Sequence, residues 1–181
     1  MAGNPVDRVI FGLGAASAAL ICWMWLGFRK PLAELQPNLT LPDLAIGENA
    51  RQTVADWFSK TATTDAGAIF HNMLTGPELY FPLVFAAFLF LILLRLLPTA
   101  RLFNRPVGGP LKAIVLVQPL TYVLADYAEN ALFLGLSGLA ESPAWMLDTA
   151  PWLTAFKFLG LSVSLVFILR FALLSRIIPK A

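Results

Sequence analysis

One apolar stretch of this sequence, residues 111–136, carries polar side chains at regular spacing. The residues are Gln118, Tyr122, Asp126, Glu129 and Asn130, separated by steps of four, four, three and one. At 3.6 residues per helical turn these side chains lie on one face, here called the polar stripe. Each carboxylate at the centre of a span costs about 2.5–3.5 kcal/mol on insertion scales. The stripe is therefore expected to face a bundle interior or a water-filled cavity, not lipid.

A single lysine in the next apolar stretch could balance these carboxylates. Lys157 lies six residues after Pro151, about 9 Å into an antiparallel helix at 1.5 Å per residue. Glu129 is about 10 Å and Asp126 about 15 Å from the same boundary. We therefore predict an ion pair of Lys157 with Glu129 or Asp126. Asn130 and Tyr122 are predicted to add hydrogen bonds.

Two carboxylates facing one lysine leave one negative charge unbalanced. Either one carboxyl is protonated, because burial and a like charge both raise its pKa, or a further positive group is present. The candidates are His71, Arg95, a bound metal ion or proton, and a cationic ligand. Arg95 is expected to reach the cytoplasmic interface, and a lone histidine in an amphipathic helix is more often interfacial than part of a site. His71 is kept as a possible contribution from the segment outside the spans.

The composition places these residues in a membrane protein. The chain has 181 residues, 58% of them hydrophobic and 13% charged, with a mean hydropathy of +0.72, whereas soluble domains are about 45–50% apolar and about 25% charged. A net charge of +2 is too small for a nucleic-acid-binding surface. One cysteine and one histidine exclude an internal disulfide, a cysteine-based metal cluster and a bis-histidine haem site. No metal site is predicted, and the sequence identifies no cofactor.

Four apolar runs are long enough to cross a bilayer, which needs about 20 residues each. They cover residues 9–28, 79–97, 111–136 and 152–174. The expected fold is all-α, a polytopic single-domain bundle of four transmembrane helices spanning residues 1–181. Basic residues in short loops set the orientation: they lie in the 98–110 loop, near the N-terminus and in the C-terminal tail, which includes Arg176 and Lys180. Both termini are therefore predicted to be cytoplasmic in a bacterial inner membrane, with Arg29 and Lys30 the one dissenting pair.

Residues 31–78 are too long for a simple connector between helices. Apolar residues recur at helical spacing over 48–60 and 66–74, with Thr64 and Asp65 suited to start the second helix. The Leu39–Ala45 stretch, which follows Pro37 and contains Pro42, is expected to be extended. The segment is predicted to form an external helical cap. It could lie on the membrane surface or over the bundle, dock another membrane protein, or act as a lid over a site.

Three short motifs carry a family resemblance. Asp126-Tyr127-Ala128-Glu129-Asn130, followed by Lys157 in the last span, resembles a group of functionally uncharacterised bacterial four-span membrane proteins with Asp-x-x-Glu-Asn in the third helix. The Leu41-Pro42-Asp43 and Glu78-Leu79-Tyr80-Phe81-Pro82 motifs are similar to that group as well. The resemblance implies the four-span topology and the importance of the stripe. It implies no activity.

Two functions agree with this pattern. The first is a non-enzymatic accessory, assembly or scaffold component of a membrane complex, in which the stripe and Lys157 only fix helix pairing and the cap binds a partner. The second is a lipid-, small-molecule- or ion-handling protein, carrier or enzyme, in which Asp126 and Glu129 bind a cation, proton or polar head group. The lipid bilayer is the expected environment of the protein, and no nucleic acid is expected as a partner.

Overall fold

The computed structural model of the chain describes residues 4–102, 105–139 and 141–177. Four of its helices are long and apolar enough to cross a membrane, which confirms the all-α class and the membrane character. Lys180, one of the basic residues used to predict the orientation, lies outside the described residues.

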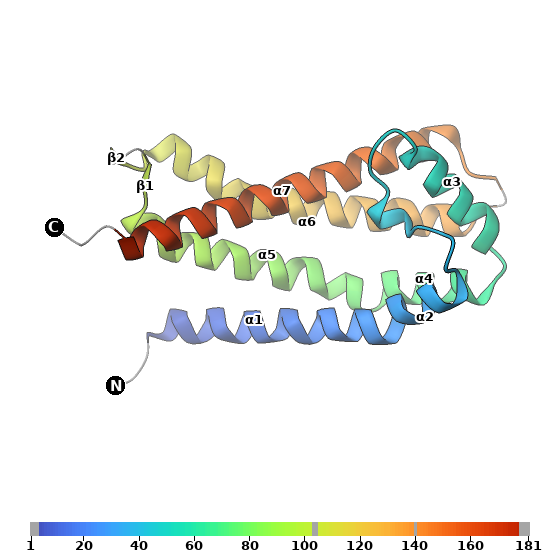
Figure 1. Ribbon diagram of the computed structural model, residues 1–181, viewed down its shortest axis with the longest axis horizontal. Coiled ribbons are helices and arrows are strands. Elements are labelled where there is room, and N and C mark those ends of the chain that lie inside the picture. The colour runs from blue at the N-terminus through green and yellow to red at the C-terminus, as the bar shows by residue number, and fades with distance from the viewer. Residues whose placement is uncertain (1–3, 103–104, 140, 178–181) are drawn as a thin grey trace.

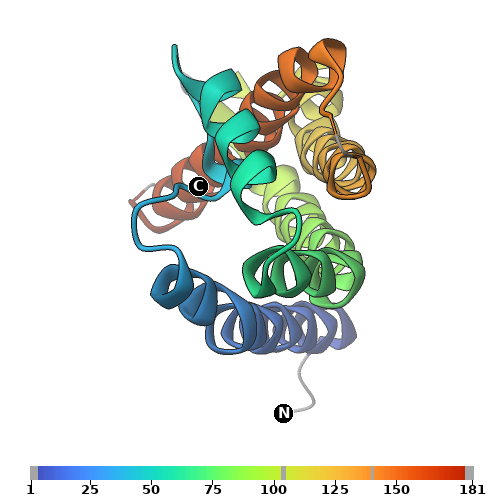
Figure 2. The ribbon, with the colours of Figure 1, turned by 90° about the vertical axis from the view of Figure 1, so that its right-hand side faces the viewer.

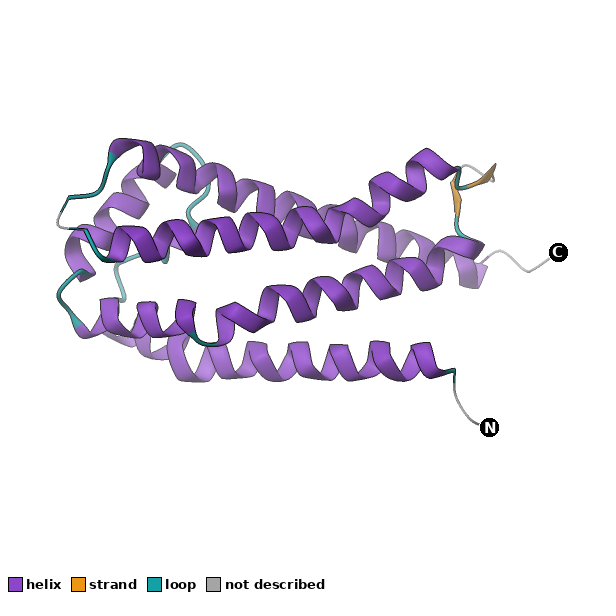
Figure 3. Cartoon of the chain, turned by 180° about the vertical axis from the view of Figure 1, so that it is seen from behind, coloured by secondary structure: helices purple, strands orange, loops and turns teal. Residues whose placement is uncertain are grey.

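The long helices run side by side and their connections gather at the two ends (Figures 1 and 3). The first is α1 (Pro5–Met24), a π-helical turn (Trp25–Arg29) and α2 (Lys30–Leu35) in one continuous run, and the others are α5 (Pro77–Leu96), α6 (Gly109–Ser137) and α7 (Ala144–Ile177). Between α5 and α6 lie a 3-10 turn (Leu97–Thr99) and a two-stranded antiparallel hairpin, β1 (Arg101–Leu102) with β2 (Arg105–Pro106). At the opposite end, residues 36–76 hold a 3-10 turn (Pro42–Leu44), α3 (Ala50–Thr61) and α4 (Asp65–Thr75).

The first helix continues past the point where the sequence predicts its end. A helix is expected to stop near Arg29-Lys30-Pro31, yet this one reaches Leu35. Proline lacks the N–H that an α-helix interior needs. Here the π-helical turn changes the hydrogen-bond register just before it, with the Lys30 N–H bonding to the Trp25 carbonyl, and Pro31 then takes one of the first positions of α2. The wider turn places Arg29 at the end of the apolar run.

The last helix also begins earlier than expected, at Ala144, so that Pro151 lies inside it. Residues 144–151 were expected to belong to the connecting loop. Pro143 supplies the start, because its carbonyl accepts the N–H groups of Met146 and Leu147. Pro151 is then the eighth residue of the helix, past its first turn, so one backbone hydrogen bond of the helix is missing at this point.

α5, α6 and α7 pack against one another, whereas α1 packs mainly along α5 (Figures 1 and 2). The closest pairing is α6 with α7. On the other side, Gly14 of α1 lies against the Phe88 ring of α5, where an added Cβ would come within 3.0 Å of the ring. The helices therefore form an uneven bundle in which α1 is the peripheral member.

The 36–76 segment packs over one end of the long helices around an aromatic cluster. Trp57 and Phe58 of α3 meet Phe70 of α4 and Phe133 of α6, with ring centroids 5.4–6.2 Å apart. Trp57, Phe70 and Phe133 are almost completely buried. Both helices predicted in this segment are present, and Thr64 caps the second by accepting from the Gly67 N–H. The Leu39–Ala45 stretch differs from the prediction, because Pro42 begins a 3-10 turn within it.

Candidate functional site

The inward face of α6 holds the acidic part of the polar stripe. Asp126 and Asn130 are buried, and Glu129 is wholly buried, with 0% of its surface exposed. Lys157 of α7 points at this face and forms ion pairs with Glu129 and, at 3.5 Å from Nζ to Oδ1, with Asp126. The predicted pair of Lys157 with a stripe carboxylate is confirmed, and the lysine contacts both candidates.

Hydrogen bonds complete the surroundings of the two carboxylates. The Asn130 amide donates to Asp126 Oδ2 at 3.2 Å, as predicted. The Thr154 hydroxyl donates to Glu129 Oε1. Thr154 lies one turn before Lys157 on the same helix, so the i, i+3 spacing from the lysine is the signal that could have identified it.

The other two stripe residues, Gln118 and Tyr122, lie two turns and one turn before Asp126 in α6 and form no hydrogen bond with this group in the described part of the chain. The Gln118 amide donates to the Ile114 carbonyl of its own helix at 3.0 Å. The buried Tyr122 ring packs edge-on against Phe85, 5.9 Å between centroids. Within the described residues, the Tyr122 hydroxyl makes no hydrogen bond, in contrast to the prediction.

A glycine sets the distance between α6 and α7 at this level. A Cβ on Gly160 would come within 2.8 Å of the Tyr122 backbone nitrogen and 2.9 Å of the Gln118 carbonyl oxygen. Only a residue without a side chain allows this approach. Gly160 is one turn beyond Lys157, so the close contact helps hold the lysine against the acidic face of α6.

A second charged group lies where the first helix, the 36–76 segment and α5 meet. Arg29 pairs with Asp43 of the 3-10 turn and lies 3.8 Å from Glu78 at the start of α5. Both carboxylate side chains are at least nine-tenths buried. In the sequence, Arg29 gives evidence only on orientation, and its ion pairs with Asp43 and Glu78 were not predicted. The available signal was Asp43 and Glu78 themselves, since each belongs to a motif of the family resemblance.

The two groups form one electrostatic unit, here called the six-charge network: Arg29, Asp43, Glu78, Asp126, Glu129 and Lys157. Glu78 is close enough to be repelled electrostatically by Asp43 and Asp126 and attracted by Lys157. Asp43 likewise repels Glu129. Four carboxylates face two cations. Arg29 is therefore the further positive group that the charge count predicted. Its partners Asp43 and Glu78 are two additional carboxylates, so the network has a formal excess of two negative charges.

Two carboxylates of the network, those of Asp43 and Glu78, are incompletely hydrogen-bonded among the described residues. One oxygen of Asp43 pairs with Arg29, whereas Oδ1 is buried and has no hydrogen-bond partner in that same part of the chain. Glu78 lies 3.8 Å from the Arg29 guanidinium and makes no hydrogen bond among the described residues. A buried carboxylate oxygen without a donor is costly, and native structures satisfy nearly all such groups. This side of the network has the chemistry to accept hydrogen bonds from a positively charged donor.

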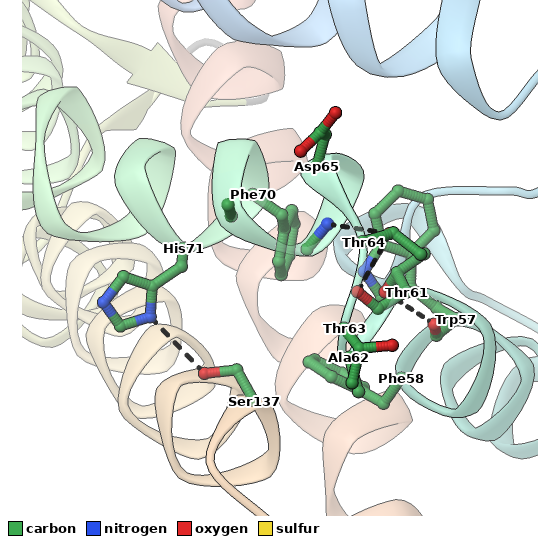
Figure 4. A pocket seen from close by; sticks show the side chains of 12 residues that line it. Trp57, Phe58, Thr61, Ala62, Thr63, Thr64, Asp65, Phe70, His71 and Ser137 are labelled. Carbon is green, nitrogen blue, oxygen red and sulfur yellow. Dashed lines mark hydrogen bonds between the residues drawn. The ribbon is translucent and has the colours of Figure 1, made fainter.

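His71 and Arg95, the two other candidate cations, lie outside the network. Arg95 pairs with Asp7 at 3.2 Å, and both side chains are more than half exposed. Exposed His71 lies 3.5 Å from Ser137 Oγ, beside a pocket of about 430 Å³ at the turn between α3 and α4 (Figure 4). Asp65, which also lines the pocket, projects from the opposite side of α4 (Figure 4), so the three side chains do not form a relay.

The carboxylates of the network are not arranged as a metal site. Across the described residues, no three histidine, cysteine, aspartate or glutamate side chains are grouped closely enough to hold a metal ion. Hard cations such as Ca²⁺ need six to eight oxygen ligands at 2.3–2.6 Å, and the network interleaves its carboxylates with Arg29 and Lys157. The arrangement suits protons or a cationic group with several N–H donors better than a chelated ion.

The sequence matches no protein-family model, no curated protein and no solved structure.

Proposed function

We propose that this membrane protein binds a positively charged group, either protons or a small cationic ligand, in the six-charge network beneath the 36–76 segment. The observation that carries this proposal is the formal excess of two negative charges in a buried place, together with Asp43 Oδ1, which has no donor among the described residues. Isolated buried charge is too costly to persist, so such groups take up a proton or a counterion. Ion handling therefore explains the network better than helix pairing alone.

A purely structural role would need fewer charges and would be balanced. Interhelical contacts in membranes use one or two hydrogen-bonding side chains and contribute about 0.6–2 kcal/mol each. Here the pair of Lys157 with Glu129, supported by Thr154, already joins α6 to α7. Glu78 adds negative charge to this region without donating or accepting a hydrogen bond among the described residues.

Native mass spectrometry of the protein extracted gently from its own membrane tests the proposal. We expect a bound molecule on the wild type that is lost in the Asp43→Asn/Glu78→Gln variant, which removes the excess charge and retains the side-chain shapes. If protons are the occupants, the wild type carries no ligand, and its unfolding releases protons at pH 7 that the double variant does not release. Asp56→Asn, an exposed carboxylate in a helical ion pair with Lys60, is the matched control. A wild type with neither ligand nor released protons contradicts the proposal.

A second candidate, an accessory subunit whose 31–78 region docks another membrane protein, is favoured by the way this region is held in place. Besides the aromatic cluster, Arg51 of α3 bonds to Asp148 of α7 at 2.6 Å. A surface held this firmly is suited to binding a partner without rearrangement. A stoichiometric second polypeptide in the same mass spectra, retained by the Asp43→Asn/Glu78→Gln variant, would favour this candidate.

We also propose the predicted orientation, with both termini in the cytoplasm of a bacterial cell and the 31–78 region outside the inner membrane. The basic residues Arg101, Arg105 and Lys112 between the second and third spans support it, because short cytoplasmic loops carry an excess of lysine and arginine. Reporter fusions at the two termini and within the 137–151 loop test the orientation.

A further inference from the structure

We infer that the positively charged group is the primary ammonium of a lipid head group, which reaches the network from the bilayer between α1 and α7. This inference rests on the proposed function and names the ligand class. Its three grounds are the depth of the network, the weak packing between α1 and α7, and the carboxylate acceptors that have no donor among the described residues.

The network lies at the level where lipid head groups meet the hydrocarbon region. Arg29 follows directly on the first apolar run, and Glu78 is the second residue of α5. Glu129 is eight residues before the end of α6, about 12 Å at 1.5 Å per residue. A polar head group of a lipid in that leaflet would be near these side chains without entering the middle of the bilayer.

α1 and α7 do not pack against each other as α5, α6 and α7 do. α1 packs on α5 and makes no comparable contact with α6 or α7. In the end-on view, residues 36–49 cross this side between α2 and α7 (Figure 2). Within this stretch Asp43 faces inward, whereas Leu44 and Ile46 are 47% and 58% exposed. The stretch thus presents apolar side chains outward and a carboxylate to the network, as a boundary between lipid and a polar site would.

The network offers complementary partners to a zwitterionic head group. An ammonium group has three N–H donors and no acceptor, and in the described part of the chain Asp43 Oδ1 and the Glu78 carboxylate have no hydrogen-bond donor. Arg29 is the most exposed member of the network, with 20% of its side chain accessible. Its planar guanidinium is suited to a phosphate. A head group with its phosphate beside Arg29 and its ammonium beside Asp43 and Glu78 would pair both of its charges with opposite charges of the network.

The test compares unfolding temperatures in nanodiscs of defined composition with matched acyl chains. Phosphatidylethanolamine presents three N–H donors, and its mono-, di- and trimethylated forms lose them one at a time. For the wild type we expect phosphatidylethanolamine to raise the unfolding midpoint by about 2–4 °C over phosphatidylcholine, with a graded loss along the methylation series. In Asp43→Asn and in Glu78→Gln the difference should vanish, whereas the Asp56→Asn control should retain it.

Two results would overturn the inference. Equal midpoints of the wild type across the methylation series would show that no N–H donor of a lipid is recognised. A shift produced by free ethanolamine in phosphatidylcholine discs, without one from phosphatidylethanolamine, would show a soluble amine as the ligand. Both results leave the proposed function standing, since native mass spectrometry and proton release test that separately. If Asp43→Asn fails to fold, Glu78→Gln alone decides the comparison.

Discussion

Removal of the Lys157 charge is the perturbation to which the network should be most sensitive. Lys157→Met removes the charge and keeps an unbranched side chain that is one atom shorter than lysine. Glu129, with 0% exposure, would keep only the Thr154 hydroxyl, and Asp126 only the Asn130 amide. The formal excess would rise from two negative charges to three.

The expected cost follows from the burial of the pair. Breaking a buried ion pair by removing one partner costs about 3–5 kcal/mol, because the other charge stays buried without compensation. An exposed i, i+4 pair contributes about 0.3–0.5 kcal/mol. Lys60→Met is therefore the matched control, since it breaks the exposed pair of Lys60 with Asp56.

Reversible unfolding in mixed micelles, followed by circular dichroism, measures both variants. We expect Lys157→Met to lose several kcal/mol and Lys60→Met less than about 0.5 kcal/mol. Adding Glu129→Gln to Lys157→Met should restore part of the loss, because the carboxylate closest to Lys157 is then gone while Asp126 stays without its cation. A Lys157→Met protein as stable as the wild type, or a double variant less stable than Lys157→Met, would refute the account of the network as a set of mutually compensating charges.

Three further substitutions test how the site is positioned. Gly160→Ala should cost about 1–3 kcal/mol despite the better helix propensity of alanine, because its Cβ would meet the Tyr122 backbone at 2.8 Å; the measurement is the unfolding free energy. Gly67→Ala should disrupt the turn between α3 and α4, where a Cβ would lie 2.2 Å from the Thr61 carbonyl oxygen, and faster limited proteolysis of that turn would show it. Thr154→Val should cost about 1–3 kcal/mol through the lost hydrogen bond to a buried carboxylate, whereas Thr154→Ser should retain most of the stability.

The sequence predicts the helices and the Lys157 contact because both follow from short-range rules. Apolar length identifies the spans, and 3.6-residue periodicity places Asp126 and Glu129 on one face. The distance of each residue from its end of the span, at 1.5 Å per residue, then places Lys157 of the antiparallel neighbour at the level of Glu129. Each of these steps needs only the distance along a helix axis.

The second half of the network could not be derived in the same way. Arg29, Asp43 and Glu78 come from three elements, and their meeting depends on a π-helical turn and on the path of residues 36–49 across the bundle. Neither feature has a periodic signal in the sequence. The position of Arg29 at a span end is equally typical of an interfacial anchor, so its type and place alone did not distinguish the two roles.

An experimental structure in phosphatidylethanolamine-containing nanodiscs tests the central claim most directly, namely that the network holds a positively charged occupant. The account predicts either non-protein density within hydrogen-bond distance of Asp43 Oδ1 and beside Glu78 or, where protons are the occupants, protonated carboxyl groups at these two residues. It would be contradicted by a structure in which both carboxylates are ionised and Asp43 Oδ1 is satisfied by a donor of the protein itself, with no density beside it.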